Sequence, residues 1–129
     1  MKLASIDVGL KRIGVAICLT SNIVTPQNAI LRKNRDQAAQ DVNAFLKEWE
    51  IDKLIVGFPS SSEDTQNRIK HFVGLLELKI PFEFQEENMS SIEAEEMMKG
   101  EIKYKRDGRV DSLAAKIILE RFLAKKPSL

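Results

Sequence analysis

Four acidic residues, in three separate segments of this sequence, are of the type that divalent-metal chemistry requires. Asp7 ends an apolar run typical of a buried strand, Glu86 and Glu87 follow another such run, and Asp111 stands in the first turn of an amphipathic helix. Carboxylate oxygens are the ligands that Mg²⁺ and Mn²⁺ prefer. Two such ions about 4 Å apart can activate a water molecule and stabilise the leaving oxygen when a phosphodiester bond is hydrolysed.

Each acid also has an ordinary structural explanation, and singly that explanation is the better one. Asp7 could cap the turn that follows it, Asp111 could complement the dipole of its helix, and the Glu86–Glu87 pair could be a solvated strand exit. Their joint placement favours a site, because sites in parallel-type sheets gather beyond the carboxyl ends of the strands and helix starts can face the same crevice.

Basic residues lie next to these acids in the sequence. Lys11 and Arg12 follow Asp7 across a short turn, and a charged loop from Gly100 to Arg109 precedes Asp111. Charge runs are usually only solvated loops, but this one includes Tyr104, which could stack on a base. We predict nucleic-acid contacts, mainly to phosphates, from six of these residues: Lys11, Arg12, Lys103, Lys105, Arg106 and Arg109.

Composition excludes some classes of protein. Twenty Lys and Arg against nineteen Asp and Glu give a net charge of +1, so the chain is not a strongly basic nucleic-acid binder. Cys18 is the one cysteine, which excludes an intrachain disulfide and fits a reducing compartment. The start of the chain has no signal-peptide pattern, and no window reaches the ~18 apolar residues of a membrane span. We expect a cytoplasmic protein without a membrane partner.

The 129 residues are expected to form a single domain, 1–129, whose elements follow from hydrophobic periodicity. Pro26 predicts an edge strand or a bulge, Asn34 with Gln37 predicts a helix-capping box, and the lone His71 is expected at a helix surface. Strands are predicted over 3–8, 12–19, 23–31, 53–57 and 81–85, with helices after 34, after 60–63, over 90–98 and from 110.

This order of elements predicts the fold class. Hairpins first and crossovers later imply an α/β fold, with a mixed five-stranded sheet and helices on both of its faces. The order matches the ribonuclease H-like fold.

Four segments resemble motifs of the YqgF/RuvX family of RuvC-like nucleases. IDVGLKRIGVAI at 6–17 resembles the opening motif of that family, and VGFP at 56–59 resembles its VGLP strand end. The segment 86–95, with EENMSS and then AE, resembles its DERLTT…AE motif. The segment 111–119 resembles its terminal DxxAAxxIL motif. The match is spread over nearly the whole chain, and four motifs in the right order are far more specific than any one.

The resemblance implies a ribonuclease H-like fold and a nuclease that uses Mg²⁺ or Mn²⁺. Asp7, Glu87 and Asp111 correspond to the three acids of the family and would be its metal-binding and catalytic residues. Glu86 takes the position of the Asp in DER. The chain departs from the family pattern in two places, and both are expected to weaken substrate contact. Asn88 replaces the Arg of DER, and the loop after Pro59 lacks the longer Gly-bearing stretch of the family.

Three functions stay open at this point. The leading one is hydrolysis of phosphodiester bonds at the 5′ end of bacterial pre-16S ribosomal RNA, with the ribosomal precursor particle as a partner. The second is a Holliday junction resolvase that acts on branched DNA. The third is a noncatalytic RNA-binding ribosome-assembly factor, which the near-neutral charge and Asn88 favour and the three acids oppose. The sequence does not indicate an oligomeric state.

Overall fold

The computed structural model describes residues 1–20, 22–60, 62–86 and 109–125. The predicted helix over 90–98 and the loop up to residue 108 lie outside this part of the chain. The last helix begins one residue earlier than predicted. The elements are β1 (Leu3–Val8), β2 (Arg12–Cys18), β3 (Val24–Leu31), α1 (Arg35–Glu48), β4 (Lys53–Phe58), α2 (Glu63–Leu76), β5 (Phe82–Glu86) and α4 (Arg109–Lys125).

The strands form one mixed sheet in the order β3-β2-β1-β4-β5. The two hairpins are antiparallel, whereas β4 pairs in parallel with both β1 and β5. The predicted mixed five-stranded sheet is therefore confirmed. Because β1, β4 and β5 run in the same direction, their carboxyl ends reach one common edge of the sheet, called here the carboxyl edge.

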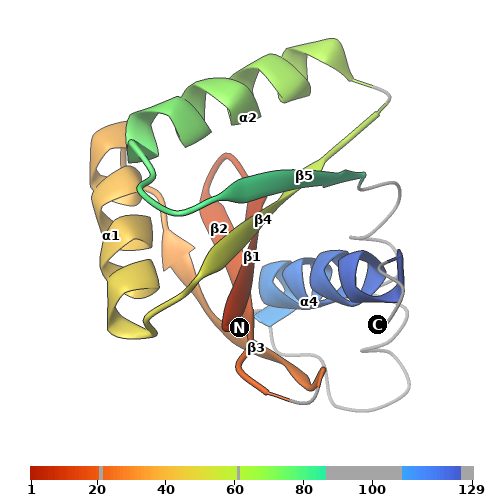
Figure 1. Cartoon of the computed structure of the whole chain (residues 1–129). Helices are drawn as coiled ribbons and strands as arrows, with labels where there is room; N and C mark the ends of the chain where they lie inside the picture. The colour runs from red at the N-terminus through yellow and green to blue at the C-terminus, as the bar shows by residue number, and fades with distance from the viewer. Residues whose placement is uncertain (21, 61, 87–108, 126–129) are drawn as a thin grey trace.

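Helices cover both faces of the sheet, as predicted (Figure 1). One face packs against α1 and α2 around side chains such as Ile6, Val56 and Phe72. The other face packs against α4, where Ile55 contacts a group that includes Ile118. Side chains alternate between the faces along a strand, so Ala4, Ile6 and Val8 of β1 face α1 and α2. The residues between them therefore face α4.

Local sequence signals explain the edge strand and the first helix. β3 is an edge strand, which confirms the edge position that Pro26 predicts. Its register with β2 shifts between Ile13 and Val15, whereas Pro26 itself pairs regularly with Ala16. The predicted capping box is present, since the Asn34 side chain accepts from the Gln37 N–H and the Gln37 side chain accepts from the Asn34 N–H.

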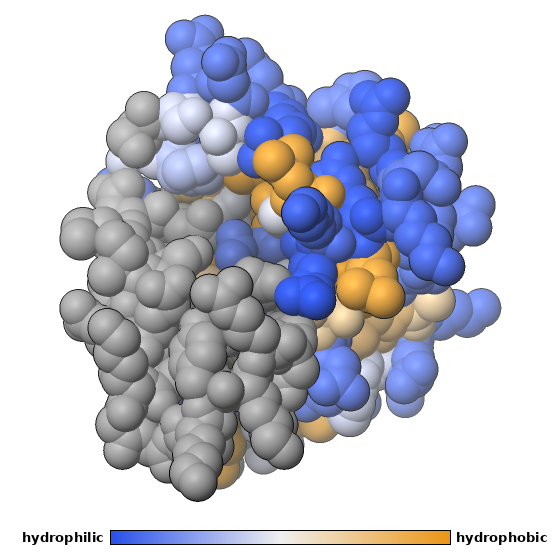
Figure 2. Space-filling view, turned by 180° about the vertical axis from the view of Figure 1, so that it is seen from behind, coloured by the Kyte–Doolittle hydropathy of each residue, from blue (hydrophilic) through white to orange (hydrophobic). Residues whose placement is uncertain are grey.

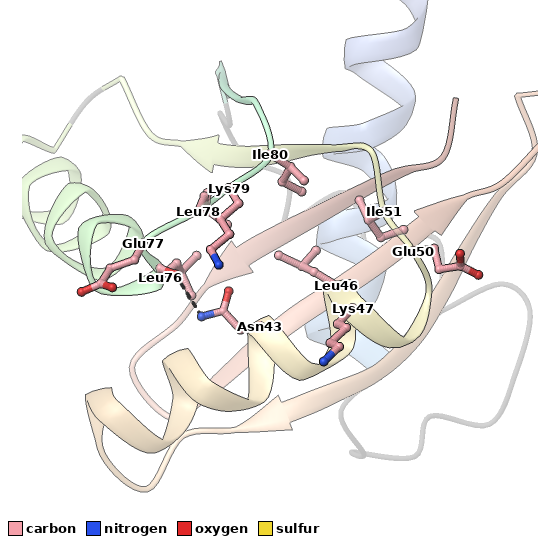
Figure 3. Close-up of a pocket in the computed structure, with 10 residues that line it drawn as sticks. All are labelled: Asn43, Leu46, Lys47, Glu50, Ile51, Leu76, Glu77, Leu78, Lys79 and Ile80. Carbon is pink, nitrogen blue, oxygen red and sulfur yellow. Dashed lines mark hydrogen bonds between the residues drawn. The ribbon is translucent and has the colours of Figure 1, made fainter.

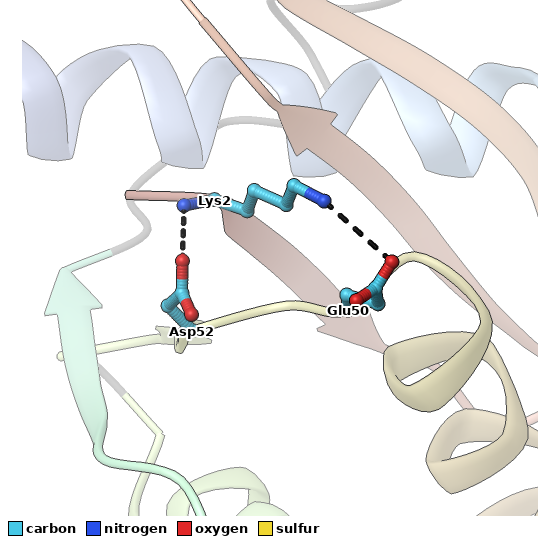
Figure 4. Close-up of polar contacts among 3 residues, drawn as sticks. All are labelled: Lys2, Glu50 and Asp52. Carbon is cyan, nitrogen blue, oxygen red and sulfur yellow. Dashed lines mark hydrogen bonds and ion pairs between the residues drawn. The ribbon is translucent and has the colours of Figure 1, made fainter.

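Lys2 makes several contacts at the edge where β1, β4 and β5 begin, called here the amino edge (Figure 4). Its backbone N–H donates to Asp52 Oδ2 at 2.7 Å, and its Nζ lies 3.9 Å from Glu50 Oε1. The Lys2 carbonyl oxygen also accepts from the Asp52 N–H at 2.8 Å. These contacts fix the start of β1 against the loop between α1 and β4, and so set the register of the two central parallel strands.

Figure 2 shows mostly hydrophilic residues outside the grey region, with hydrophobic residues in separate patches. Large hydrophobic side chains that are exposed in the described residues include Ile23 directly before β3, Leu31 at its end and Phe82 at the start of β5. None of the described helices is long and apolar enough to cross a membrane.

Candidate active site

Asp7 lies one residue before the end of β1 and faces α4. It is half-buried, and its alternation with Ile6 and Val8 places it on the same face as Ser5. Gly14 of β2 is its Cα partner. On the other side, Gly57 comes directly after Val56, which pairs with Ile6. Neither neighbouring strand therefore projects a side chain beside this carboxylate, which leaves room for a ligand or a backbone to approach.

Two serine hydroxyls hold the beginning of α4 over this region. Ser5 Oγ donates to the Ala115 carbonyl oxygen at 2.6 Å, and both residues are buried. The Val15 N–H donates to Ser112 Oγ at 3.4 Å, at the register shift between β2 and β3. The first turn of α4, which contains Asp111, thus lies on the same face as Asp7, beside the strand that carries Gly14.

Gln85 and Glu86, the last two residues of β5, face opposite sides of the sheet. Glu83 contacts Lys53 at 2.8 Å, and Lys53 Nζ lies 5.2 Å from the ring centroid of Phe122 on α4, so this side of β5 faces α4. Gln85 shares that face, is buried, and its Oε1 has no hydrogen-bond partner among the described residues. Glu86 is exposed and shares the opposite face with Phe84. Asp7 and Glu86 therefore lie on opposite faces of the sheet.

The turn after Asp7 is held by a close backbone approach. The Gly9 N–H donates to the Arg12 carbonyl oxygen at 3.0 Å, and a Cβ at Gly9 would collide with that oxygen. The Arg32 N–H donates to the Lys11 carbonyl oxygen at 2.9 Å. Only glycine leaves space for this geometry, which orients the last residues of β1.

The predicted basic residues are described only in part. Lys11 and Arg12 are exposed at the β1–β2 turn, beside the carboxyl end of β1. Arg109 is the first residue of α4. The other predicted contacts lie outside the described residues: Lys103, Lys105 and Arg106. The same holds for Glu87, Asn88 and Tyr104.

The described side chains alone do not make a metal site. Within them, no group of three His, Cys, Asp or Glu residues could hold an ion. Of the three predicted ligands, Asp7 is described in full and Asp111 is placed within the first turn of α4. The proposed ligand set therefore stays a prediction, and its donors would be carboxylate oxygens, which suit Mg²⁺ and Mn²⁺.

Sequence reasoning overlooked Ser5, Ser112 and Gln85. A buried polar residue must be hydrogen-bonded or serve a site, so the buried segments around them held a usable signal. The polar residues inside the apolar run of β1 are Ser5 and Asp7, two positions apart, and strand alternation alone predicts that they share a face.

Cys18 and His71 lie outside the candidate site, and the surface position expected for His71 is confirmed. Cys18 is a buried free thiol, and burial raises its pKa. His71 is exposed on α2, where its Nε2 lies 2.9 Å from Arg35 Nη1.

A surface cavity of about 670 Å³ lies away from Asp7 (Figure 3). It is formed by the carboxyl end of α1 and the connection from α2 to β5, and Asn43 Nδ2 donates to the Leu76 carbonyl oxygen beside it at 3.0 Å. Both segments lead into strands that begin at the amino edge. The cavity is therefore at the opposite edge from the candidate active site.

Comparison with known proteins identifies relatives over nearly the whole chain. A family model described as "RuvX: Holliday junction resolvase" matches residues 1–125. Two curated relatives are each named "Putative pre-16S rRNA nuclease". The one from Sulfurovum sp. (strain NBC37-1) is 65% identical over 127 residues, covering 96% of this chain and 99% of the relative. The one from Sulfurimonas denitrificans is 52% identical over 129 residues, covering 98% and 99%.

Solved structures agree on the fold. Thermus thermophilus RuvC in complex with a Holliday junction substrate superposes with a TM-score of 0.60 at 14% identity, covering 100% of this chain and 99% of that one. Fowlpox virus resolvase with its Holliday junction substrate gives 0.58 at 17% identity, covering 97% and 100%. At these identities the likeness concerns architecture, and it confirms the predicted ribonuclease H-like fold.

Proposed function

The chain belongs to the RuvX family, and from this we propose that it is a nuclease that processes the 5′ end of pre-16S ribosomal RNA. The relatives from Sulfurovum and Sulfurimonas, which match this chain over almost their full length, are each named "Putative pre-16S rRNA nuclease". The structural observation that carries the proposal is the position of Asp7. Its half-buried carboxylate ends a central parallel strand, is flanked by two glycines, and faces the helix turn that contains Asp111.

We assign the metal-binding role to Asp7, Glu87 and Asp111. Bound Mg²⁺ or Mn²⁺ would activate a water molecule and stabilise the leaving oxygen of the phosphodiester. The chain itself would supply carboxylate oxygens at fixed positions. Ser5 and Ser112 support this proposal by fixing the start of α4 relative to β1 and β2, which would hold the backbone of Asp111 at a set distance from Asp7.

The substrate would be held mainly through its phosphates. Lys11 and Arg12 project from the turn next to Asp7, and Arg109 begins the helix that carries Asp111. With Lys103, Lys105 and Arg106, these residues would surround the acids with positive charge, which positions a strand without reading its sequence. Action on a ribosomal RNA precursor, free or within the precursor particle, would place the protein in the cytoplasm.

A second candidate function is resolution of Holliday junctions. The description of the matching family model favours it. The same acids would serve both reactions, so the choice depends on contacts to the substrate, and above all on the RNA 2′-hydroxyl groups.

The two functions are separated by cleavage assays on the purified full chain. A 5′-labelled pre-16S ribosomal RNA fragment and a labelled four-way DNA junction are incubated with Mg²⁺ or Mn²⁺, with Asp7→Asn as control. We expect the wild-type protein to cut the RNA and leave the junction intact, and Asp7→Asn to cut neither. Junction cleavage alone would favour the second function. Binding of RNA without cleavage of either substrate would favour a noncatalytic assembly factor.

A further inference from the structure

Three arginines from separate segments gather on the α1/α2 side of the β1–β2 turn. Arg32 follows β3, Arg35 is the first residue of α1, and Arg68 lies in α2. Arg32 Nη1 donates to the Gly9 carbonyl oxygen at 2.9 Å, and its guanidinium carbon lies 5.4 Å from the ring centroid of Phe72. Arg32 and Arg68 are half-buried. We call Arg32, Arg35, Arg68 and the adjacent His71 the arginine cluster.

No acidic side chain in the described part of the chain forms an ion pair with this cluster. The buried Nε of Arg68 has no hydrogen-bond partner among the described residues. Burial lowers the pKa of Arg32, and the positive charges of Arg68 and Arg35 lower it further. Like charges this close are costly unless a counter-charge arrives.

Two further features add positive potential. Arg35 stands at the amino end of α1, where the helix dipole disfavours a cation and favours an anion. Because an arginine can only donate, its contact with His71 makes Nε2 of that ring the acceptor, at 2.9 Å. The remaining N–H groups of Arg35 are left to donate elsewhere. This geometry suits an anion with several acceptor oxygens, as in a phosphodiester.

The cluster is adjacent to the candidate active site. Its Arg32 contacts the carbonyl of Gly9, two residues after Asp7, or roughly 7 Å along an extended chain. The exposed Lys11 and Arg12 lie in the same turn. A strand of nucleic acid that crosses the carboxyl edge at Asp7 would pass over this turn and reach the cluster.

We propose that Arg32, Arg35 and Arg68 bind a backbone phosphate of the nucleic-acid substrate, on the side of the β1–β2 turn away from α4, with His71 holding Arg35 in place. This inference deepens the proposed function and rests on it. It adds a contact surface formed by α1 and α2 to the one predicted on the α4 side. The substrate would then be held on both sides of the bond that is cut.

The test measures RNA binding in a protein that does not cut. In an Asp7→Asn background without metal, the affinity for a fluorescent single-stranded RNA is measured by anisotropy at several KCl concentrations. Arg35→Gln and Arg68→Gln are each expected to weaken binding about tenfold, the effect of losing one charge-assisted hydrogen bond. The slope of log affinity against log salt should fall by about 0.7 for each lost phosphate contact. Lys79→Gln is the matched control, because it makes the same charge change at the exposed amino edge.

Thermal unfolding separates binding from a structural role. Removing one of three mutually repelling cations should leave the melting temperature of the free protein unchanged or raise it, while RNA affinity falls. Arg68→Lys, which keeps the charge, should retain more affinity than Arg68→Gln. A variant that loses affinity only as it loses folded stability would assign the arginines a structural role and overturn the proposal.

Two further outcomes would also overturn it. The glutamine variants could bind RNA as tightly as the Lys79→Gln control. Alternatively, inorganic phosphate alone could stabilise the wild type but not the variants while RNA affinity stays unchanged, which would indicate a site for free phosphate. Cleavage by the wild-type protein is scored separately, so failure of the nuclease assignment and failure of the arginine cluster give different results.

Discussion

Ser5 and Ala115 join the central strand of the sheet to α4 through a buried hydrogen bond of 2.6 Å. Ser5 is two residues before Asp7 and shares its face, and Ala115 is one helical turn after Asp111. One contact therefore sets the distance between the elements that carry two of the proposed metal ligands. Its loss should affect the site more than the fold.

Replacing Ser5 by Ala should lower the free energy of unfolding by about 1 kcal/mol, the usual net value of one hydrogen bond. The rate of RNA cleavage should fall further than this, because α4 would be free to shift relative to Asp7. Asn43→Ala is a matched control, since it removes a side-chain bond to the Leu76 carbonyl at the other edge. A cleavage rate that falls equally in both variants would contradict the positioning role of Ser5.

Replacing Gly9 by Ala should destabilise the β1–β2 turn. The new methyl group would meet the Arg12 carbonyl oxygen, and overpacking of this kind costs roughly 1–3 kcal/mol. Chemical denaturation measures the loss. Gly74→Ala is the control, because a Cβ there meets no neighbouring atom and a helix interior prefers alanine. We expect Gly74→Ala to be as stable as the wild type or more so.

The Cys18 thiol should be unreactive in the folded protein. The thiolate is the nucleophile, and burial raises the pKa of this thiol above its ordinary range. Because the unfolded chain ionises at lower pH, this group's contribution to stability should decline as the pH rises above about 8.5. Labelling with a disulfide reagent at pH 8 should be slow in buffer and fast in denaturant. Equal rates in both would show that Cys18 is accessible.

Divalent metal should raise the melting temperature of the wild-type protein, because it binds the native acids in preference to the unfolded chain. Asp7→Asn should weaken that response, and Asp36→Asn, which changes an exposed acid in the first turn of α1, should keep it. Differential scanning fluorimetry with millimolar Mg²⁺ and Mn²⁺ checks this. A melting temperature that changes with neither ion would count against the metal assignment.

Local signals in the sequence predicted much of the fold. Asn34 and Gln37 fixed the start of α1 because a capping box involves residues three positions apart. Pro26 predicted an edge position because proline cannot donate to a sheet ladder, and β3 is at the edge. The placement of Asp7 near the end of β1 followed in the same way from a nearly continuous apolar run.

The arginine cluster could not be predicted in this way. Arg32 and Arg68 are far apart in the sequence, and their approach depends on how α2 crosses the β1–β2 turn. Strand alternation predicts that Ser5 and Asp7 share a face, but which helices cover that face, and which face Glu86 takes, depend on strand register. Such relationships arise from tertiary packing and carry no local pattern.

The most direct test of the account is the rate at which the purified protein cleaves a pre-16S ribosomal RNA fragment under single-turnover conditions in Mg²⁺. Wild type, Asp7→Asn and Asp36→Asn are compared with the enzyme in excess and the folding of each variant checked by circular dichroism. We predict metal-dependent cleavage by the wild type and Asp36→Asn, and a loss of about a hundredfold in Asp7→Asn, since mutating even a residue that only orients a metal ligand typically costs about 10–100-fold. Cleavage by Asp7→Asn at the wild-type rate would contradict the central claim that Asp7 lies in the active site.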